Sequence, residues 1–198
     1  MITQFIFALI MTLVSIVYST FIPTDRLVHL DLKGAPPKIS YIEQFFPFIK
    51  SLGATGLLIE YEDMFPFWGP IKPLSASNAY TRREIEQILT LAHDNELKVI
   101  PLIQTFGHLE FGLKLPEFAK LREVAQHPQA LCPSKNGSRE LIQNMVDQVM
   151  TLHKTSHWLH IGCDEVYQLG QCSSCIQRLR NHEQNWIFLQ HVQSGVAE

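Results

Sequence analysis

The sequence lacks the features that identify several classes of protein. Charged residues make up only 18% of the 198 residues, the net charge is −3 and the basic residues do not cluster, which argues against nucleic acid as the main partner. No GxGxxG or GxxxxGK[ST] pattern follows a predicted strand, so the usual nucleotide-binding loops are absent. The hydrophobic share of 46% is that of a globular chain able to bury a sizeable core. A neutral or modestly polar small molecule is therefore the expected ligand.

Charge is missing altogether from residues 1–20. The apolar part of this segment, 5–17, is shorter than the roughly 20 residues of a membrane span, and the small residues Ser19 and Thr20 follow it. We interpret residues 1–20 as a secretory signal peptide, with an uncleaved membrane anchor as the alternative. This interpretation predicts a secreted or membrane-anchored protein whose folded domain is 21–198.

Cysteine is scarce, with four residues in the chain: Cys132, Cys163, Cys172 and Cys175. Cys172 and Cys175 form a single C-x-x-C pair. A zinc site of this kind needs a second pair of ligands, and His182 is the only nearby imidazole. We therefore expect two surface thiols or one local disulfide, and we expect neither a metal nor a cofactor.

Beyond residue 25, apolar strands alternate with amphipathic helices. The predicted strands are 26–32, 56–61, 98–104 and 157–162, and the predicted helices are 40–52, 82–93, 138–152 and 175–192. A helix after every strand predicts a parallel α/β sheet, and the apolar strands predict that both of its faces are covered. Two architectures fit: a small doubly wound sheet, or the first four βα units of a (β/α)₈ barrel, which needs about 250 residues in full.

Capping patterns mark the first two predicted helices. Ser40 with Glu43 and Thr81 with Glu84 each have the spacing of a capping box. The apolar residues that follow at helical spacing predict which helix faces turn inward. The last predicted helix has Ile176 and Leu189 among its apolar positions.

Polar residues follow all four predicted strands. They include Asp31, Lys33 and Gly34 after the first strand, Glu60, Glu62 and Asp63 after the second, Gln104, His108 and Glu110 after the third, and Asp164 and Glu165 after the fourth. One such acid alone is readily explained as a solvated strand end. Four strand ends that converge at one edge of a parallel sheet, with aromatic residues beside them, indicate a binding site. Carboxylates that bind hydroxyls, with rings that stack on a pyranose, suit a sugar.

Four segments resemble, in order, the family 20 glycoside hydrolases, in particular the hexosaminidase D branch of β-N-acetylhexosaminidases: HLDLKGAPPKISY, LLIEYEDMFPF, VIPLIQTFGHLEF and WLHIGCDEVYQLG. The resemblance implies a (β/α)₈ barrel, of which residues 21–198 would be a truncated catalytic domain with the first four βα units. The implied activity is removal of terminal β-linked N-acetylhexosamine, GlcNAc or GalNAc, from a glycan or glycoconjugate. Similar proteins of this branch are typically intracellular, which gives a cytoplasmic or nuclear location as the alternative to secretion.

The resemblance also implies roles for individual residues. Glu165 would be the general acid, Asp164 would hold the acetamido N–H, and His108 would support the general acid. The nucleophile would be the 2-acetamido carbonyl of the substrate, an exception to the usual pair of enzyme carboxylates. The acidic partner of His108 would be Glu62 or Asp63.

A further implied role belongs to Arg26, which would hold sugar hydroxyls. A structural salt bridge is the alternative role for Arg26.

The resemblance covers only half of the family barrel. Further pocket residues, including aromatics that clamp the acetamido group, come from the second half of that barrel. A half barrel has two open sheet edges, which promote association unless they are covered. We therefore expect a fragment, an isoform with little activity, or a half that pairs with another chain through these edges. A catalytically incomplete sugar-binding module is the alternative function.

Overall fold

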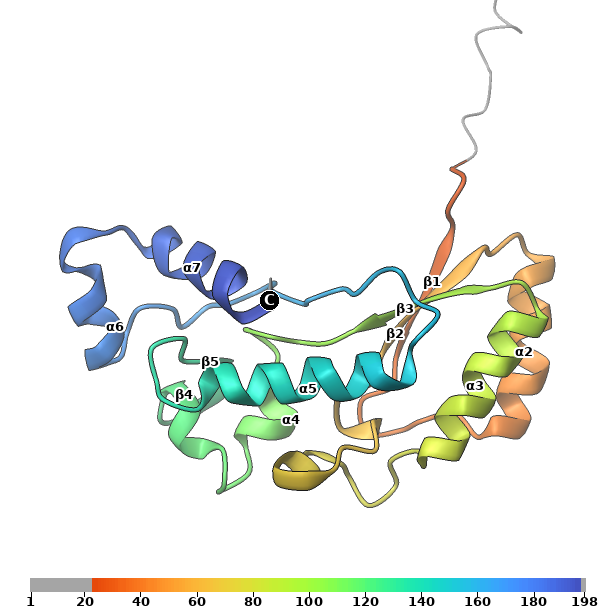
Figure 1. Cartoon of the computed structure of the whole chain (residues 1–198), viewed down its shortest axis with the longest axis horizontal. Coiled ribbons are helices and arrows are strands. Elements are labelled where there is room, and N and C mark those ends of the chain that lie inside the picture. The colour runs from red at the N-terminus through yellow and green to blue at the C-terminus, as the bar shows by residue number, and fades with distance from the viewer. Residues whose placement is uncertain (1–22, 197–198) are drawn as a thin grey trace, which may run out of the picture.

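The computed structural model describes residues 23–196, so the predicted signal peptide or anchor lies outside the described part (Figure 1). The βα units comprise β1 Leu27–Asp31, α2 Ile39–Ser51, β2 Gly56–Glu60, α3 Arg82–Asp94, β3 Lys98–Leu102 and α5 Ser138–Leu152. Short elements lie between them: 3₁₀ turns Glu62–Met64, Gly69–Leu74 and Ala119–Leu121, helix α4 Glu110–Leu113, and strands β4 Arg122–Val124 and β5 His127–Leu131. Of the helices described, none has the length and apolar character needed to cross a membrane.

The sheet is parallel, in the order β1-β2-β3. The predicted fourth strand lies beside β3 in the parallel direction, but it forms only one bridge, between His160 and Leu102. His160 donates its N–H to the carbonyl of Pro101 and accepts from the N–H of Ile103, both at 2.9 Å. The sheet is therefore the start of a barrel, partial and unclosed. Because β1 pairs only with β2 among the described residues, association through its free edge stays a prediction.

The two faces of this sheet differ. Leu57 and Ile59 of β2 lie in the main core, at 0% and 2% exposure, together with Phe46 of α2 and Ile85 of α3. The alternate residues face the other way. His29 there is exposed, and Leu58 and Ile100 are half-buried. Glu60 and Leu102 on this second face are buried, at 6% and 5% exposure, so the prediction that both faces are covered holds only in part for the described residues. This second face is the one that would line the interior of a closed barrel.

The starts of α2 and α3 show that a capping-box pattern in the sequence does not always form a capping box in the structure. The box at α3 is confirmed: Glu84 donates its N–H to the Thr81 hydroxyl, and Thr81 donates its N–H to the Glu84 carboxylate. The box predicted at Ser40 is wrong. Lys38 is the N-cap of α2, and no side chain caps this helix.

The last predicted helix is two helices. The first, α6, spans Ser173–Arg178 and is followed by a 3₁₀ turn over Leu179–Asn181. The second, α7, spans Gln184–Val196. This break changes the helical phase. Ile176 and Leu189, two apolar positions of the predicted helix, are 55% and 56% exposed.

A second, smaller core holds this C-terminal part of the chain. It contains Phe106, Cys132, Leu169, Cys175 and Ile187. The Phe106 ring lies 4.2 Å from that of His191 on α7. Figure 1 shows α6 and α7 at the end of the molecule away from α2 and α3.

Candidate active site at the carboxyl edge of the sheet

Three predicted site residues meet where β3 and the 157–162 segment end. His108 Nε2 lies 3.2 Å from Glu165 Oε2 and 3.6 Å from Asp164 Oδ2. The histidine follows β3, and the acids follow the segment beside it. The parallel arrangement therefore brings together side chains that are more than 50 residues apart in sequence.

The backbone is unusual at two of these residues. Glu165 has a φ of 49° and His108 has a φ of 54°, values in the left-handed region that non-glycine residues rarely adopt. Adjacent residues of a regular strand point to opposite faces, whereas Asp164 and Glu165 both reach His108. The end of the strand allows this turn. Such local strain is concentrated at functional sites.

Two residues that were not among the predicted site residues, Gly107 and Gln129, hold the acidic pair in place. A Cβ on Gly107 would overlap the main-chain oxygen of Asp164, so only glycine allows the two loops to approach this closely. Gln129 of β5 donates its Nε2–H to the main-chain oxygen of Glu165 at 2.6 Å. The glycine before His108 was a possible signal in the sequence, but nothing there pointed to Gln129.

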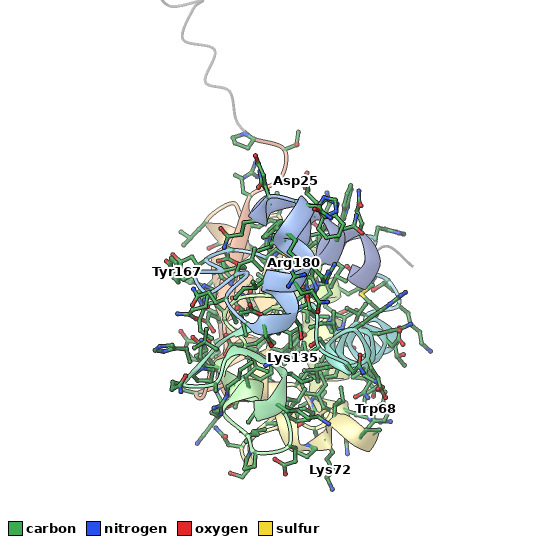
Figure 2. The ribbon with its side chains drawn as sticks, turned by 90° about the vertical axis from the view of Figure 1, so that its left-hand side faces the viewer. Asp25, Trp68, Lys72, Lys135, Tyr167 and Arg180 are labelled. Carbon is green, nitrogen blue, oxygen red and sulfur yellow. The ribbon has the colours of Figure 1, made fainter. Side chains whose placement is uncertain are left out.

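The acidic pair faces solvent. The side chains of Asp164 and Glu165 are 62% and 54% exposed. The Tyr167 hydroxyl is hydrogen-bonded to the Glu165 carboxylate, which raises the pKa of Tyr167. Tyr167 itself lies on the surface, near the left edge of the molecule in Figure 2. A ligand can therefore reach both acids and a neighbouring aromatic ring.

Glu62 and Asp63 follow β2 but do not pair with His108, whose ion pairs within the described residues are those with Asp164 and Glu165. Both acids instead contact the loop after β1. Lys33 Nζ lies 3.0 Å from Glu62 Oε1, and Asp63 accepts a hydrogen bond from a main-chain N–H of that loop. Burial raises the pKa of Glu62 to about 7, against the opposing effect of the lysine.

Arg26 lies apart from the other predicted site residues. It directly precedes β1, whose opposite end carries Asp31. Five strand residues span roughly 16 Å, so Arg26 is at the amino edge of the sheet. Its Nε donates to the carbonyl of Gly53 at 2.6 Å. In this structure the Arg26 side chain contacts main-chain carbonyls rather than an acid, away from the acidic pair, and its contact with sugar hydroxyls stays a prediction.

A polar network on the open face of the sheet joins Glu60 and Gln104, two of the predicted strand-end residues, with His29, which was not predicted. Gln104 Nε2 donates to Glu60 Oε1 at 2.7 Å, and His29 Nε2 lies 3.0 Å from Glu60 Oε2. Two side-chain oxygens, Gln104 Oε1 and Glu62 Oε2, are buried and have no hydrogen-bond partner in the protein. Buried polar atoms of this kind are usually satisfied by water or a ligand.

Comparison with known families decides between the two predicted architectures. The model of the glycosyl hydrolase family 20 catalytic domain matches residues 49–198. The chain belongs to family 20 of the glycosyl hydrolases. Hexosaminidase D of Bos taurus is 56% identical over 155 residues, which are 78% of this chain and 45% of that protein. Hexosaminidase D of Homo sapiens is 57% identical over 160 residues, which are 81% and 33% of the two chains.

Solved structures support the same fold. The family 20 chitobiase of Flavobacterium johnsoniae superposes with a TM-score of 0.70 at 16% identity, covering 86% of this chain and 30% of the other. The chain therefore spans less than half the length of each of these relatives. The family 20 domain described here is thus a partial, unclosed barrel.

Family membership leaves one cluster unexplained. Glu123, Cys132, Cys172 and Cys175 bring their ligand atoms within 4.8 Å of one another. The prediction of two surface thiols is wrong for Cys175, which is buried, and the cysteines are free rather than disulfide-bonded. Neither Glu123 nor Cys132 is near the C-x-x-C pair in sequence, so spacing could not reveal them.

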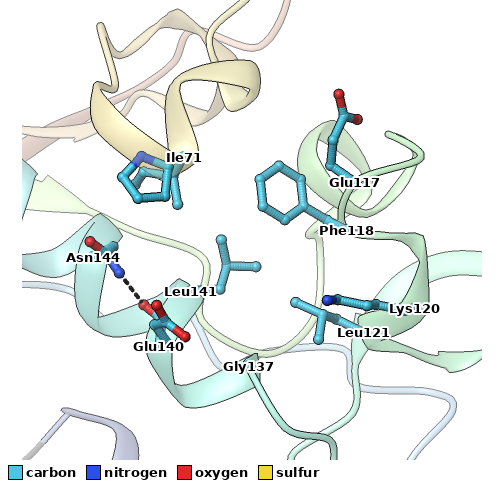
Figure 3. Close-up of a pocket in the computed structure, with 10 residues that line it drawn as sticks. Ile71, Glu117, Phe118, Lys120, Leu121, Gly137, Glu140, Leu141 and Asn144 are labelled. Atoms are coloured by element: carbon cyan, nitrogen blue, oxygen red, sulfur yellow. Dashed lines mark hydrogen bonds between the residues drawn. The ribbon is translucent and has the colours of Figure 1, made fainter.

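A separate pocket of about 160 Å³ lies between the Gly69–Leu74 turn and α5. Figure 3 shows Phe118 and Leu121 on one side and Leu141 at its centre, with Asn144 donating to the carbonyl of Glu140. No predicted site residue lines this pocket. It is therefore not part of the family 20 acidic site.

Proposed function

We propose that this chain carries the acid–base machinery of a β-N-acetylhexosaminidase, with Glu165 as the proton donor. The observation that supports the proposal most directly is the contact of one imidazole, His108, with both Asp164 and Glu165 on a family 20 domain. Glu165 protonates the glycosidic oxygen and so releases the leaving sugar or aglycone.

Asp164 has a different role in this proposal. The acetamido carbonyl oxygen of the substrate attacks the anomeric carbon, and positive charge develops on the acetamido nitrogen. The Asp164 carboxylate accepts a hydrogen bond from the acetamido N–H and stabilises that charge. Water then opens the cyclic intermediate as Glu165, now a carboxylate, accepts a proton. No enzyme carboxylate bonds to the sugar.

In this proposal His108 gives the two carboxylates different surroundings, and so different roles. It lies 0.4 Å closer to Glu165 than to Asp164, since the distances are 3.2 and 3.6 Å. Two neighbouring acids work as a donor and a stabiliser only when their surroundings differ. An imidazole that lies at unequal distances from the two carboxylates, and a Tyr167 hydroxyl that is hydrogen-bonded to Glu165, supply this difference.

The test is hydrolysis of an aryl N-acetyl-β-hexosaminide by purified 21–198. Glu165→Gln should lower kcat by about 10²–10⁴-fold, because the amide cannot donate the proton. Asp164→Asn keeps the shape of the side chain and should lower kcat by a similar order. Turnover by both variants equal to that of the parent chain would overturn the proposal.

A second substrate tests the source of the nucleophile. The matching aryl β-glucoside has a hydroxyl in place of the acetamido group. Under the proposal it should not be cleaved, because no carbonyl is available to attack the anomeric carbon. Comparable turnover of both substrates would instead indicate an enzyme nucleophile.

Sugar binding without hydrolysis is the second candidate function. The exposure of Asp164 and Glu165, at 62% and 54%, favours it, because acid–base catalysis gains from exclusion of water. In that case the chain would bind N-acetylglucosamine, and NMR would detect chemical-shift changes near His108. The chain would not hydrolyse the aryl substrate. The hydrolysis assay distinguishes the two functions.

A further inference from the structure

Four side chains from separate segments converge beside the β4–β5 hairpin. Glu123 is on β4, Cys132 directly follows β5, and Cys172 and Cys175 lie at the start of α6. Cys132 Sγ is 3.3 Å from Cys172 Sγ and 3.6 Å from Cys175 Sγ, and Glu123 Oε2 is 3.3 Å from Cys175 Sγ. Figure 2 looks onto this end of the molecule.

These distances fit a metal better than a disulfide. A disulfide requires sulfurs about 2.05 Å apart, and both sulfur pairs around Cys132 are much farther apart. Tetrahedral zinc with Zn–S bonds of about 2.3 Å places two sulfur ligands about 3.8 Å apart. All four ligand atoms lie within 4.8 Å, so a small inward or outward adjustment of the side chains would complete the tetrahedron.

The surroundings orient the ligands. Glu123 Oε1 accepts the main-chain N–H groups of Gln171 and Cys172, at 2.6 and 2.8 Å, which turns Oε2 toward the cluster. The main-chain N–H of Cys175 donates to Cys172 Sγ at 3.3 Å. Contacts of this type fix metal ligands in place and favour their deprotonated forms.

We propose that Glu123, Cys132, Cys172 and Cys175 bind one zinc ion in a closed S₃O site. Thiolate ligands select a soft or borderline cation such as zinc, and four protein ligands leave no open position for substrate, so the role is structural. The ion ties the segment that follows Glu165 to the β4–β5 hairpin. Gln129 on β5 already contacts the main chain of Glu165, so zinc would stabilise the position of the acidic pair.

The first test is the metal content of the chain, purified with a reductant and without added chelator. Elemental mass spectrometry should find about one zinc ion per chain. Cys172→Ser and Glu123→Ala should each lower the zinc content or weaken zinc binding by about tenfold or more, judged from the loss of a ligand. The matched control is Cys163→Ser, because Cys163 is the cysteine outside the cluster, and it should keep its zinc.

A second measurement needs no variant that could fail to fold. Cobalt added to the chelated parent chain should give thiolate-to-cobalt charge-transfer absorption and the intense ligand-field bands of a tetrahedral site, and zinc should abolish both. Thiol titration should find one readily reactive cysteine with zinc bound and four after chelation. The proposal is overturned if the chain holds no zinc and develops no cobalt spectrum. It is equally overturned if the intact mass is two hydrogens lower because of a disulfide.

Discussion

Two regions of this molecule are stabilised in different ways. The region built from β1–β3, α2, α3 and α5 has one continuous apolar core that includes fully buried residues on every one of these helices. The C-terminal region, 163–196, contributes only Leu169, Cys175 and Ile187 to a small core of five buried residues, and it is attached to the hairpin largely through polar contacts. The acidic pair belongs to the second region.

This difference has a consequence for the site. Apolar burial is roughly proportional to area and has no preferred direction, so it stabilises the first region without fixing any one atom. Hydrogen bonds and close backbone contacts are directional. The positions of Asp164 and Glu165 therefore depend on a few specific contacts, and small changes there should affect activity more than stability.

The largest effect on stability is expected in the first region. Phe46→Ala removes a fully buried ring of α2 and should lower the free energy of unfolding by about 3–5 kcal/mol. Phe48 on the same helix is 58% exposed, so Phe48→Ala should change the free energy of unfolding by less than about 0.5 kcal/mol. Urea denaturation of both variants measures this difference. Equal losses would contradict the placement of the core.

A smaller change in stability, but a large loss of activity, is expected for Gly107→Ala. The added Cβ would overlap the main-chain oxygen of Asp164 and press on the oxygen of Glu165 at 3.3 Å, so the two loops must separate. We expect a cost of about 1–3 kcal/mol and, under the proposed function, a fall in kcat of about tenfold or more, since small misplacements reduce rates strongly.

Gly112→Ala is the matched control for this prediction. A Cβ on Gly112 meets only the Leu74 side chain, at 2.7 Å, and that side chain can move. This variant should keep the activity of the parent chain. If Gly112→Ala lost as much activity as Gly107→Ala, the effect would be general destabilisation and not displacement of the acidic pair.

The sequence predicted the first region well because its packing is local and periodic. Helices α3 and α5 begin at their predicted residues, Arg82 and Ser138, and the three strands lie within the predicted ranges. A helix with a complete capping box, or with an apolar stripe along one face, carries its boundaries in neighbouring residues.

The second region could not be predicted in this way. The contact of Gln129 with Glu165 and the meeting of Glu123 with Cys175 join residues 36 and 52 positions apart. No periodic pattern encodes such contacts. The segment around His160 was apolar enough to predict a strand, yet it has only one bridge, because strand pairing depends on the neighbour as well as on composition.

The last prediction concerns a polar group within the first region, whose effect is limited to the pH dependence of stability. The folded chain raises the pKa of Glu62 from 4.5 to about 7, through burial that Lys33 only partly offsets. The stability that Glu62 contributes is therefore fully present below about pH 4.5 and is lost as the pH rises through about 7. Glu62→Gln should remove this pH dependence, whereas Glu43→Gln on the exposed side of α2 should keep it. Unfolding curves between these pH values measure the slope. A parent chain whose stability rises over this range, relative to the Glu62 variant, would show that Lys33 outweighs burial and that Glu62 is held as a carboxylate.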